Sequence, residues 1–289
     1  MYVDSQALSD RRPQGAEAPD EYIGEESPVV SVSALRLFPD FLSSVFAKGA
    51  TTLNASSSHN TSQERPVILI NGMGSNFDAQ WRRHGWVAKL EAAGRTVIGV
   101  DLPGHGASKD AVGRDAADLI LEEAAKHAPV DGIGFSAGAW ALLLAASEQP
   151  ALFARIAVLA AADLVLTGGL HTEAMNQPLI SALRSPAEPT DNPMVTLLRT
   201  VIADAGNDPE AVAGYLASSK RFVTIEGLGS IKATALIIDG GADETGQSEL
   251  VSRTIPHAER TTIEGANHFE IPNTAHCLDV AVSFINTAD

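Results

Sequence analysis

The sequence predicts an α/β fold in which a mostly parallel central sheet is covered by helices on both faces. Two observations support this class. After residue 66, short apolar runs alternate with longer segments of helical periodicity, which is the order that produces parallel strands joined by crossover helices. The chain also has 289 residues, of which 45% are hydrophobic. A chain of this size can bury a large core in one such domain without a metal or a disulfide.

The individual elements follow from periodicity and from the residues that end each run. We expect strands at 67–70, 96–100, 130–135, 156–160, 235–238 and 260–263. Helices are expected in the segment that contains Trp81, Trp86, Val87 and Leu90 and ends at Gly94, and at 114–127, 137–148 and 274–285.

The alternation of strands and helices breaks at about residue 164. From 164 to 215 the pattern is helical but interrupted by Pro178, Pro186, Pro189 and Pro193. An insertion between two core strands, near the carboxyl edge of the sheet, suits a small helical lid over a pocket.

Composition divides the chain into three parts. Residues 1–27 are acidic with few apolar groups, so we expect them to be disordered. Residues 28–65 combine a strand-like and a helix-like stretch with a polar linker, and residues 66–289 form the α/β domain with its insertion at 164–215.

Charge and cysteine content exclude several classes of function. The formal net charge of −16 disfavours binding to nucleic acid or to an anionic membrane. No apolar stretch approaches the length of a membrane span, and no secretory signal pattern is visible, so we expect a cytoplasmic protein. Cys277 is the single cysteine, which rules out a disulfide within the chain.

The most informative motif is Gly-Phe-Ser-Ala-Gly at residues 134–138. It lies between a predicted strand and a predicted helix, which is the context that G-x-S-x-G requires to expose a reactive serine. Gly134 and Gly138 remove side chains that would block the close approach of strand and helix. Ser136 is therefore the candidate nucleophile, placed where helical N–H groups can stabilise a developing negative charge.

Three further motifs occur in a fixed order around this serine: Asn-Gly-Met-Gly at 71–74, Asp-Leu-Pro-Gly-His-Gly-Ala-Ser at 101–108, and the pair Gly-Gly-Ala-Asp at 240–243 and Gly-Ala-Asn-His at 265–268. With these motifs the chain resembles the α/β-hydrolase family from about residue 66 to the C-terminus. The order Ser, Asp, His is the one that this fold uses for its catalytic residues.

A serine hydroxyl needs a base to become a good nucleophile, and the base needs a carboxylate to fix its tautomer. By resemblance, the base is His268 and the carboxylate is Asp243. Asp239 and Glu244 are close rivals for the acid, and Asp163 stands where some relatives carry it.

The resemblance also implies an oxyanion hole made by the backbone N–H groups of Met73 and Ala137. Many relatives have His-Gly where this chain has Asn71-Gly72, and an asparagine can make a similar hydrogen bond that holds the loop. The residues proposed to line the substrate pocket are Gly72, Trp140, Leu164 and Leu166. Trp140 lies four positions after Ser136 on one helix face, and it suits either the core or the pocket wall.

The resulting prediction is a serine hydrolase, independent of cofactors and metals, that cleaves a small to medium carboxylic ester or lactone through an acyl-enzyme. Its partner is then a small-molecule substrate. The alternatives are a carbon–carbon bond hydrolase, an acyltransferase or a perhydrolase with the same triad. A hydrolase-fold receptor with little turnover is the alternative outside catalysis.

Overall fold

The computed structural model describes residues 65–163, 166, 173–185, 190–218 and 221–288, and the statements below concern these residues. The expectations for residues 1–27, and for 28–65 up to residue 64, lie outside this part of the chain. The same applies to Leu164, Pro186 and Pro189.

Six parallel strands form one sheet, which confirms the predicted fold class. The strands are β1 (Val67–Ile70), β2 (Val97–Val100), β3 (Val130–Phe135), β4 (Phe153–Leu159), β5 (Thr234–Gly240) and β6 (Ala258–Ile263). They lie in the order β2-β1-β3-β4-β5-β6, and every neighbouring pair is parallel.

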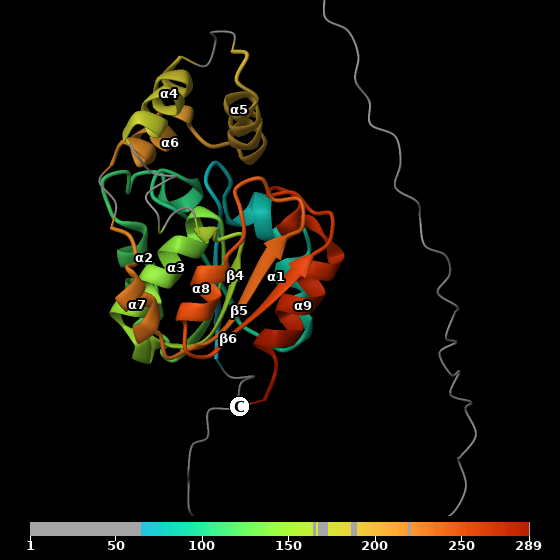
Figure 1. The fold of residues 1–289 in the computed structure, drawn as a ribbon. Coiled ribbons are helices and arrows are strands. Elements are labelled where there is room, and N and C mark those ends of the chain that lie inside the picture. Colours follow the sequence, from blue (N-terminus) through green and yellow to red (C-terminus); the bar gives the residue numbers. More distant parts are fainter. Residues whose placement is uncertain (1–64, 164–165, 167–172, 186–189, 219–220, 289) are drawn as a thin grey trace, which may run out of the picture. The chain divides into compact units, whose positions relative to one another are not determined.

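Helices cover both faces of this sheet (Figure 1). Successive side chains of a strand point to opposite faces, and β1 shows the division: Ile68 and Ile70 join one apolar cluster, while Val67 and Leu69 join the other. The first cluster is completed by α2 (Ala116–Ala124), α3 (Ala137–Glu148), α7 (Ile225–Ser230) and α8 (Glu249–Thr254), and the second by α1 (Trp86–Ala92) and α9 (Ala275–Ile285).

The strand order changes direction between β1 and β3, because the chain goes from β1 outward to β2 and then returns to the other side of β1. In open parallel sheets the crevice at such a point, beyond the carboxyl ends of the strands, is where ligands bind. The loops that follow β1, β3, β5 and β6 all reach this edge, and they carry the predicted site residues.

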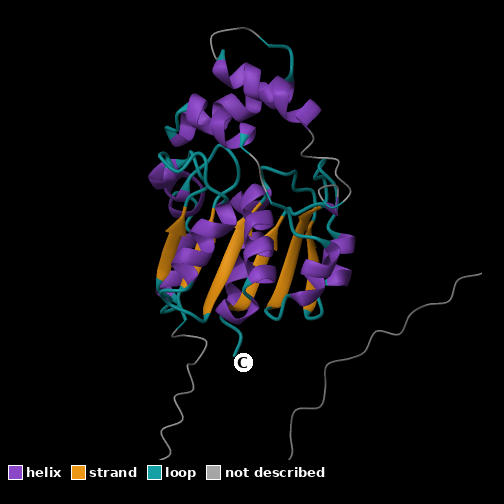
Figure 2. Ribbon diagram, turned by 90° about the vertical axis from the view of Figure 1, so that its left-hand side faces the viewer, coloured by secondary structure: helices purple, strands orange, loops and turns teal. Residues whose placement is uncertain are grey.

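Before α7, the described part of the chain between β4 and β5 forms three further helices, namely α4 (Glu173–Arg184), α5 (Pro193–Ala205) and α6 (Pro209–Ala217). They lie beyond the carboxyl ends of the strands (Figure 2). They have a small apolar cluster of their own, to which Met73 adds its side chain. Pro193 begins α5, but Pro178 lies inside α4 rather than interrupting it.

Several boundaries differ from the predicted ones. The helix expected around Trp81 and Trp86 is two elements, a short π-helical turn η1 (Asp78–Arg82) and α1, because Gly85 adopts a φ of 83° between them. The helix expected at 114–127 is α2, which begins after its cap Asp115. Helices α7 and α8 were not predicted.

A buried ion cluster joins the amino ends of the central strands. The Asp131 carboxylate on β3 accepts hydrogen bonds from the Arg65 side chain at 3.3 Å, from the Arg95 guanidinium, and from the Arg155 backbone N–H at 3.0 Å. Arg95 also donates to the Ile285 carbonyl at 3.0 Å, so the cluster fastens the last helix to the sheet. None of the helices in the described part of the chain has the length and apolar character needed to cross a membrane.

Candidate active site

Ser136 lies on a sharp turn between β3 and α3, with φ 51° and ψ −117°. A non-glycine residue at positive φ is strained, and such strain persists only where the surrounding structure enforces it. A Cβ on Gly134 would lie 2.7 Å from the Gly138 carbonyl oxygen, and one on Gly138 would lie 2.4 Å from the Asn71 carbonyl oxygen. Both glycines are therefore required for the turn, as the sequence predicted.

His268 follows β6 and places its ring against Ser136. Its Nε2 lies 3.0 Å from the Ser136 Oγ, although the two residues are far apart in the sequence. The rings of Phe135 and Phe269 both lie near it, with centroids 5.1 and 5.2 Å from that of the imidazole. These aromatic contacts limit the orientations of the His268 ring.

Asp243, after β5, contacts the other nitrogen of this ring. Its Oδ2 lies 3.0 Å from the His268 Nδ1, while its Oδ1 accepts hydrogen bonds from Thr245 N at 2.8 Å and from Thr245 Oγ1 at 2.7 Å. Burial alone would raise the pKa of the Asp243 carboxyl. The hydrogen bond and charge of His268, together with the two Thr245 bonds, instead hold that pKa below its usual value. Sequence reasoning missed Thr245, and no motif marked it.

The rival carboxylates have other partners. Asp239 is buried and binds the Ser248 hydroxyl at 2.6 Å and the Arg260 side chain at 2.6 Å. Asp163 accepts hydrogen bonds from the first amides of α8. Glu244 is exposed. Of these four acids, Asp243 is therefore the one that forms a hydrogen bond with the His268 ring.

A turn over residues 72–75 follows β1 and carries the first predicted oxyanion donor, Met73. The Ser75 N–H closes the turn onto the Gly72 carbonyl at 3.3 Å, and Gly74 takes a φ of 86°, as the third residue of a type II turn must. The Asn71 side chain donates to the carbonyls of Gly72 at 2.9 Å and Ser75 at 2.8 Å. Asn71 therefore holds the turn from within.

His105 also holds this turn, through its side chain. The buried imidazole accepts a hydrogen bond from the Gly74 N–H at its Nε2, at 2.9 Å, and its Nδ1 lies 2.9 Å from the Pro103 carbonyl.

The second predicted donor, Ala137, is the first residue of α3, where amides have no acceptor within the helix. Met73 and Ala137 line the same cavity as Ser136 and His268.

This cavity has a volume of about 200 Å³ and is lined mainly by aliphatic and aromatic side chains. Its lining contains no Asp, Glu, Lys or Arg among the described residues, and its other polar members are Asn176, Tyr215 and Thr245. Trp140, a predicted pocket residue, lines it. Gly72 lies against the Phe135 ring and Leu166 against the cluster of α2 and α3, and neither belongs to the lining.

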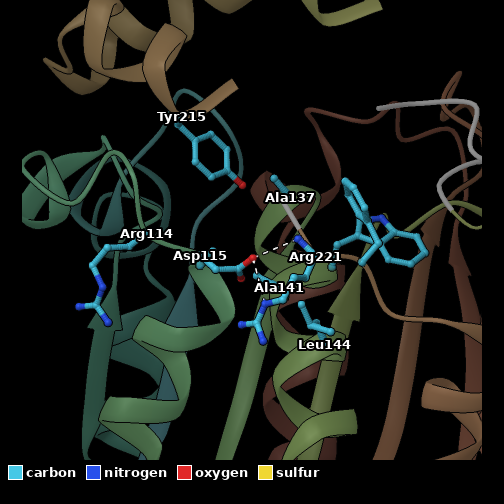
Figure 3. A pocket seen from close by; sticks show the side chains of 10 residues that line it. Arg114, Asp115, Ala137, Ala141, Leu144, Tyr215 and Arg221 are labelled. Atoms are coloured by element: carbon cyan, nitrogen blue, oxygen red, sulfur yellow. Dashed lines mark hydrogen bonds and ion pairs between the residues drawn. The ribbon is translucent and has the colours of Figure 1, made fainter. Parts of the chain in front are cut away.

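Trp140, Ala137 and Tyr215 also border a small hollow next to the cavity. In Figure 3, Tyr215 reaches from α6 towards Ala137. The Asp115 carboxylate accepts a hydrogen bond from the Arg221 backbone N–H at 3.1 Å and forms an ion pair with the Arg221 side chain. Burial and the nearby Asp115 charge raise the pKa of Tyr215, so its hydroxyl stays neutral. A neutral phenol therefore borders both the cavity and the hollow, and the ion pair of Arg221 with Asp115 lines the hollow.

The model of the alpha/beta hydrolase family matches residues 67–281. Among solved structures, a bromoperoxidase from Bacillus anthracis is 19% identical with a TM-score of 0.59, covering 76% of this chain and 91% of its own. An enol-lactonase from Burkholderia xenovorans is 19% identical with a TM-score of 0.52, covering 77% and 92%.

An esterase from a Rhodococcus species is 15% identical with a TM-score of 0.53, covering 79% of this chain and 92% of its own. At such identities these likenesses show the fold alone. The search of the curated proteins found no match. Because the family model matches most of the chain, this protein belongs to the alpha/beta hydrolase family.

Proposed function

We propose that this protein is a serine hydrolase that cleaves a neutral carboxylic ester or lactone through an acyl-enzyme. The observation that carries the proposal is the pair of 3.0 Å contacts from the two His268 nitrogens, one to the Ser136 Oγ and one to the Asp243 Oδ2. This is the arrangement in which an imidazole can take a hydroxyl proton while a carboxylate fixes its tautomer.

In the first half-reaction the Ser136 Oγ attacks the carbonyl carbon of the substrate, and its proton passes to the His268 Nε2. The carbonyl oxygen becomes an oxyanion, which accepts hydrogen bonds from the Met73 and Ala137 N–H groups. The bond to the leaving oxygen then breaks, and the proton on Nε2 passes to that oxygen. An alcohol leaves and an acyl-enzyme remains; from a lactone, the new hydroxyl stays attached to the acyl group.

In the second half-reaction water takes the place of the alcohol. It attacks the acyl carbon while its proton passes to the His268 Nε2, and the same oxyanion forms. When the bond to the Ser136 Oγ breaks, this oxygen recovers the proton and a carboxylic acid leaves. Throughout the cycle Asp243 stays ionised and stabilises the imidazolium that forms at each attack.

The cavity supports a neutral and largely apolar substrate. An apolar cavity of about 150 Å³ accommodates a molecule of the size of benzene, so the cavity of about 200 Å³ suits an acyl or alkyl group of that size or slightly larger. The described lining has no Asp, Glu, Lys or Arg. Burying an ionised group against it would cost several kcal/mol, on the order of a buried unpaired charge. We further propose that α4–α6 serve as the lid of this cavity, since Asn176, Leu198 and Tyr215 line it from these helices.

A fluorophosphonate probe tests the proposed nucleophile. The wild type should react with one equivalent, Ser136→Ala should not react, and a peptide map should place the label on Ser136. The matched control is Ser147→Ala on the same helix, because the Ser147 hydroxyl bonds to the Leu144 carbonyl and lies outside the cavity. Folded wild type that does not react, or that reacts equally after Ser136→Ala, contradicts the proposal.

A panel of p-nitrophenyl esters then separates the proposed reaction from its alternatives. Turnover should be highest for uncharged acyl groups of about four to eight carbons and at least tenfold lower for acyl groups that end in a carboxylate, following the cavity lining. A reactive serine together with inert esters would instead favour carbon–carbon bond hydrolysis. Product that forms only with added alcohol or hydrogen peroxide would favour acyl transfer or perhydrolysis.

A further inference from the structure

Asn207 occupies the short connection between α5 and α6. Gly206 ends α5 with a φ of 67°, and the Asn207 N–H donates back to the Ile202 carbonyl at 3.0 Å. Asp208 then caps α6 by accepting from the Glu210 N–H. The Asn207 side chain caps neither helix, and it extends towards the two glycine turns beneath.

Both ends of this amide bind backbone groups of those turns. The Asn207 Oδ1 accepts a hydrogen bond from the Gly106 N–H at 2.9 Å. Its Nδ2 donates to the Gly74 carbonyl at 2.8 Å and to the Ser75 carbonyl at 3.0 Å. A single partly buried side chain thus joins α5 and α6 to the turn at 72–75 and to the turn at 104–106.

The turns and the two helices also contact each other directly. A Cβ on Gly74 would lie 2.9 Å from a Leu198 methyl carbon of α5, and a Cβ on Gly104 would lie 2.5 Å from the Ala211 carbonyl oxygen of α6. In addition, the Asn76 side chain donates to the Ala205 carbonyl at 2.8 Å. The helices therefore rest on the two turns, and Asn207 lies at the centre of this contact.

The consequence concerns the direction of the Met73 N–H. The peptide unit between Gly72 and Met73 is planar, so fixing the Gly72 carbonyl fixes the opposite N–H. That carbonyl is held by the Ser75 N–H and by the Asn71 side chain, and Ser75 in turn is held by Asn207. Loss of Asn207 would free the Gly74–Ser75 side of the turn. The remaining side-chain supports would be Asn71, the His105 contact to Gly74, and the Gln80 Oε1, which accepts from the Gly72 N–H at 2.8 Å.

We propose that Asn207 is a positioning residue that fixes the oxyanion-binding turn from the α5–α6 connection. Through Asn207, the direction of the Met73 N–H depends on the placement of α5 and α6. This inference rests on the proposed function, since Met73 matters only if an oxyanion forms beside it. Its effect should fall on the transition state rather than on substrate binding, because Asn207 is absent from the cavity lining.

Two variants with different chemistry test this role. Asn207→Ala removes these three bonds, together with the one that the Asn207 Oδ1 accepts from the Asn76 Nδ2 at 3.4 Å. It should lower kcat by about tenfold to 10²-fold, the loss expected from misplacing a catalytic group by part of an ångström, while KM changes less than about threefold. Asn207→Asp keeps an acceptor for the Gly106 N–H but turns a carboxylate oxygen towards the carbonyls of Gly74 and Ser75. It should lower kcat at least as much.

A trifluoromethyl ketone gives a second readout, because its adduct with Ser136 carries an oxyanion at the position of the intermediate. Its affinity should fall by the same factor as kcat/KM in both Asn207 variants. The matched control is Asp208→Ala, which removes the cap of α6 and leaves the Asn207 bonds in place. This control should lower the melting temperature but change neither kcat nor the affinity for the ketone.

The outcomes separate the two proposals. If the folded Asn207 variants show wild-type kcat and ketone affinity, or lose activity only through KM, the positioning role is wrong while the proposed function stands. If Asp208→Ala loses as much kcat as Asn207→Ala, general loosening of α6 explains the effect and the role is also overturned. If the wild type itself neither hydrolyses esters nor binds the ketone, the proposed function fails.

Discussion

Replacing Asp243 by asparagine should inactivate the protein by reversing the tautomer of His268. The Asp243 Oδ1 accepts two hydrogen bonds, from Thr245 N at 2.8 Å and Thr245 Oγ1 at 2.7 Å. The carbonyl oxygen of the new amide would therefore occupy the Oδ1 position, because its NH₂ group cannot accept these bonds. The NH₂ group would then face the His268 Nδ1, at the place where Oδ2 now lies 3.0 Å away.

An NH₂ group in that position donates to Nδ1 and leaves the ring proton on Nε2. The Nε2, which lies 3.0 Å from the Ser136 Oγ, then has no lone pair for the serine proton. The same substitution in a serine protease triad lowers kcat by about 10⁴-fold, and at 1.36 kcal/mol per factor of ten this is about 5 kcal/mol of transition-state stabilisation. We expect a loss of that order in kcat, with little change in KM.

The assay compares the kcat of Asp243→Asn with that of Asp243→Ala on one uncharged p-nitrophenyl ester, with melting temperatures to confirm folding. Alanine removes the carboxylate without adding an N–H group that faces Nδ1, so Asp243→Ala should keep at least as much activity as Asp243→Asn. Thr245→Val, which removes one of the two donors to the Asp243 Oδ1, should lower kcat only a few-fold. Folded Asp243→Asn with more than a tenth of wild-type kcat would refute the tautomer argument.

Three further predictions concern stability. Gly138→Ala should destabilise the protein by about 1–3 kcal/mol in denaturant titrations, because its Cβ would lie 2.4 Å from the Asn71 carbonyl oxygen, whereas Gly229→Ala, with nothing within 4 Å, should not destabilise it. Asp131→Asn should cost about 3–5 kcal/mol, since it leaves two guanidinium groups in a buried site without their counter-charge. The pKa of Asp243 is lowered in the folded state, so its contribution to stability is complete above the unfolded pKa of about 4 and is lost as the pH falls through the folded pKa. The wild type should therefore lose more unfolding free energy than Asp243→Asn between about pH 5 and pH 3.

The central strands of the sheet could be predicted because they are buried on both faces. Buried parallel strands appear as continuous apolar runs bounded by polar loops, and β1 and β3 have the bounds expected from the sequence. Helices α7 and α8 could not be found in this way, because each has only six residues and they bury Leu228 and Val251 respectively. A helix of fewer than two turns shows no periodicity to detect.

Within the candidate site, the residues carried by glycine-containing motifs could be predicted, because such loops need particular backbone shapes that constrain the sequence. Thr245, His105 and Asn207 were not assigned their roles. Each has a side chain that contacts another segment: Thr245 Oγ1 lies 3.3 Å from the His268 Nδ1, His105 accepts from the Gly74 N–H, and Asn207 donates to the Gly74 and Ser75 carbonyls. No local pattern encodes these partners, since they meet only when the carboxyl ends of the strands are brought together.

Asn71 departs from the His-Gly pair expected by resemblance, and its contacts show how it holds the turn at 72–75. Its amide makes three hydrogen bonds, donating to the Gly72 carbonyl at 2.9 Å and the Ser75 carbonyl at 2.8 Å and accepting from the Leu102 N–H at 3.1 Å. An imidazole has two ring nitrogens, and in its neutral form only one donates, so a histidine at this position could not make all three. Asparagine therefore ties the turn at 72–75 to the segment after β2 from the inside, as Asn207 ties it to α5 and α6 from the outside. The Gln80 Oε1 adds a third carboxamide, which accepts from the Gly72 N–H at 2.8 Å. The turn that carries Met73 is consequently held by carboxamides, and its geometry does not require a histidine at position 71.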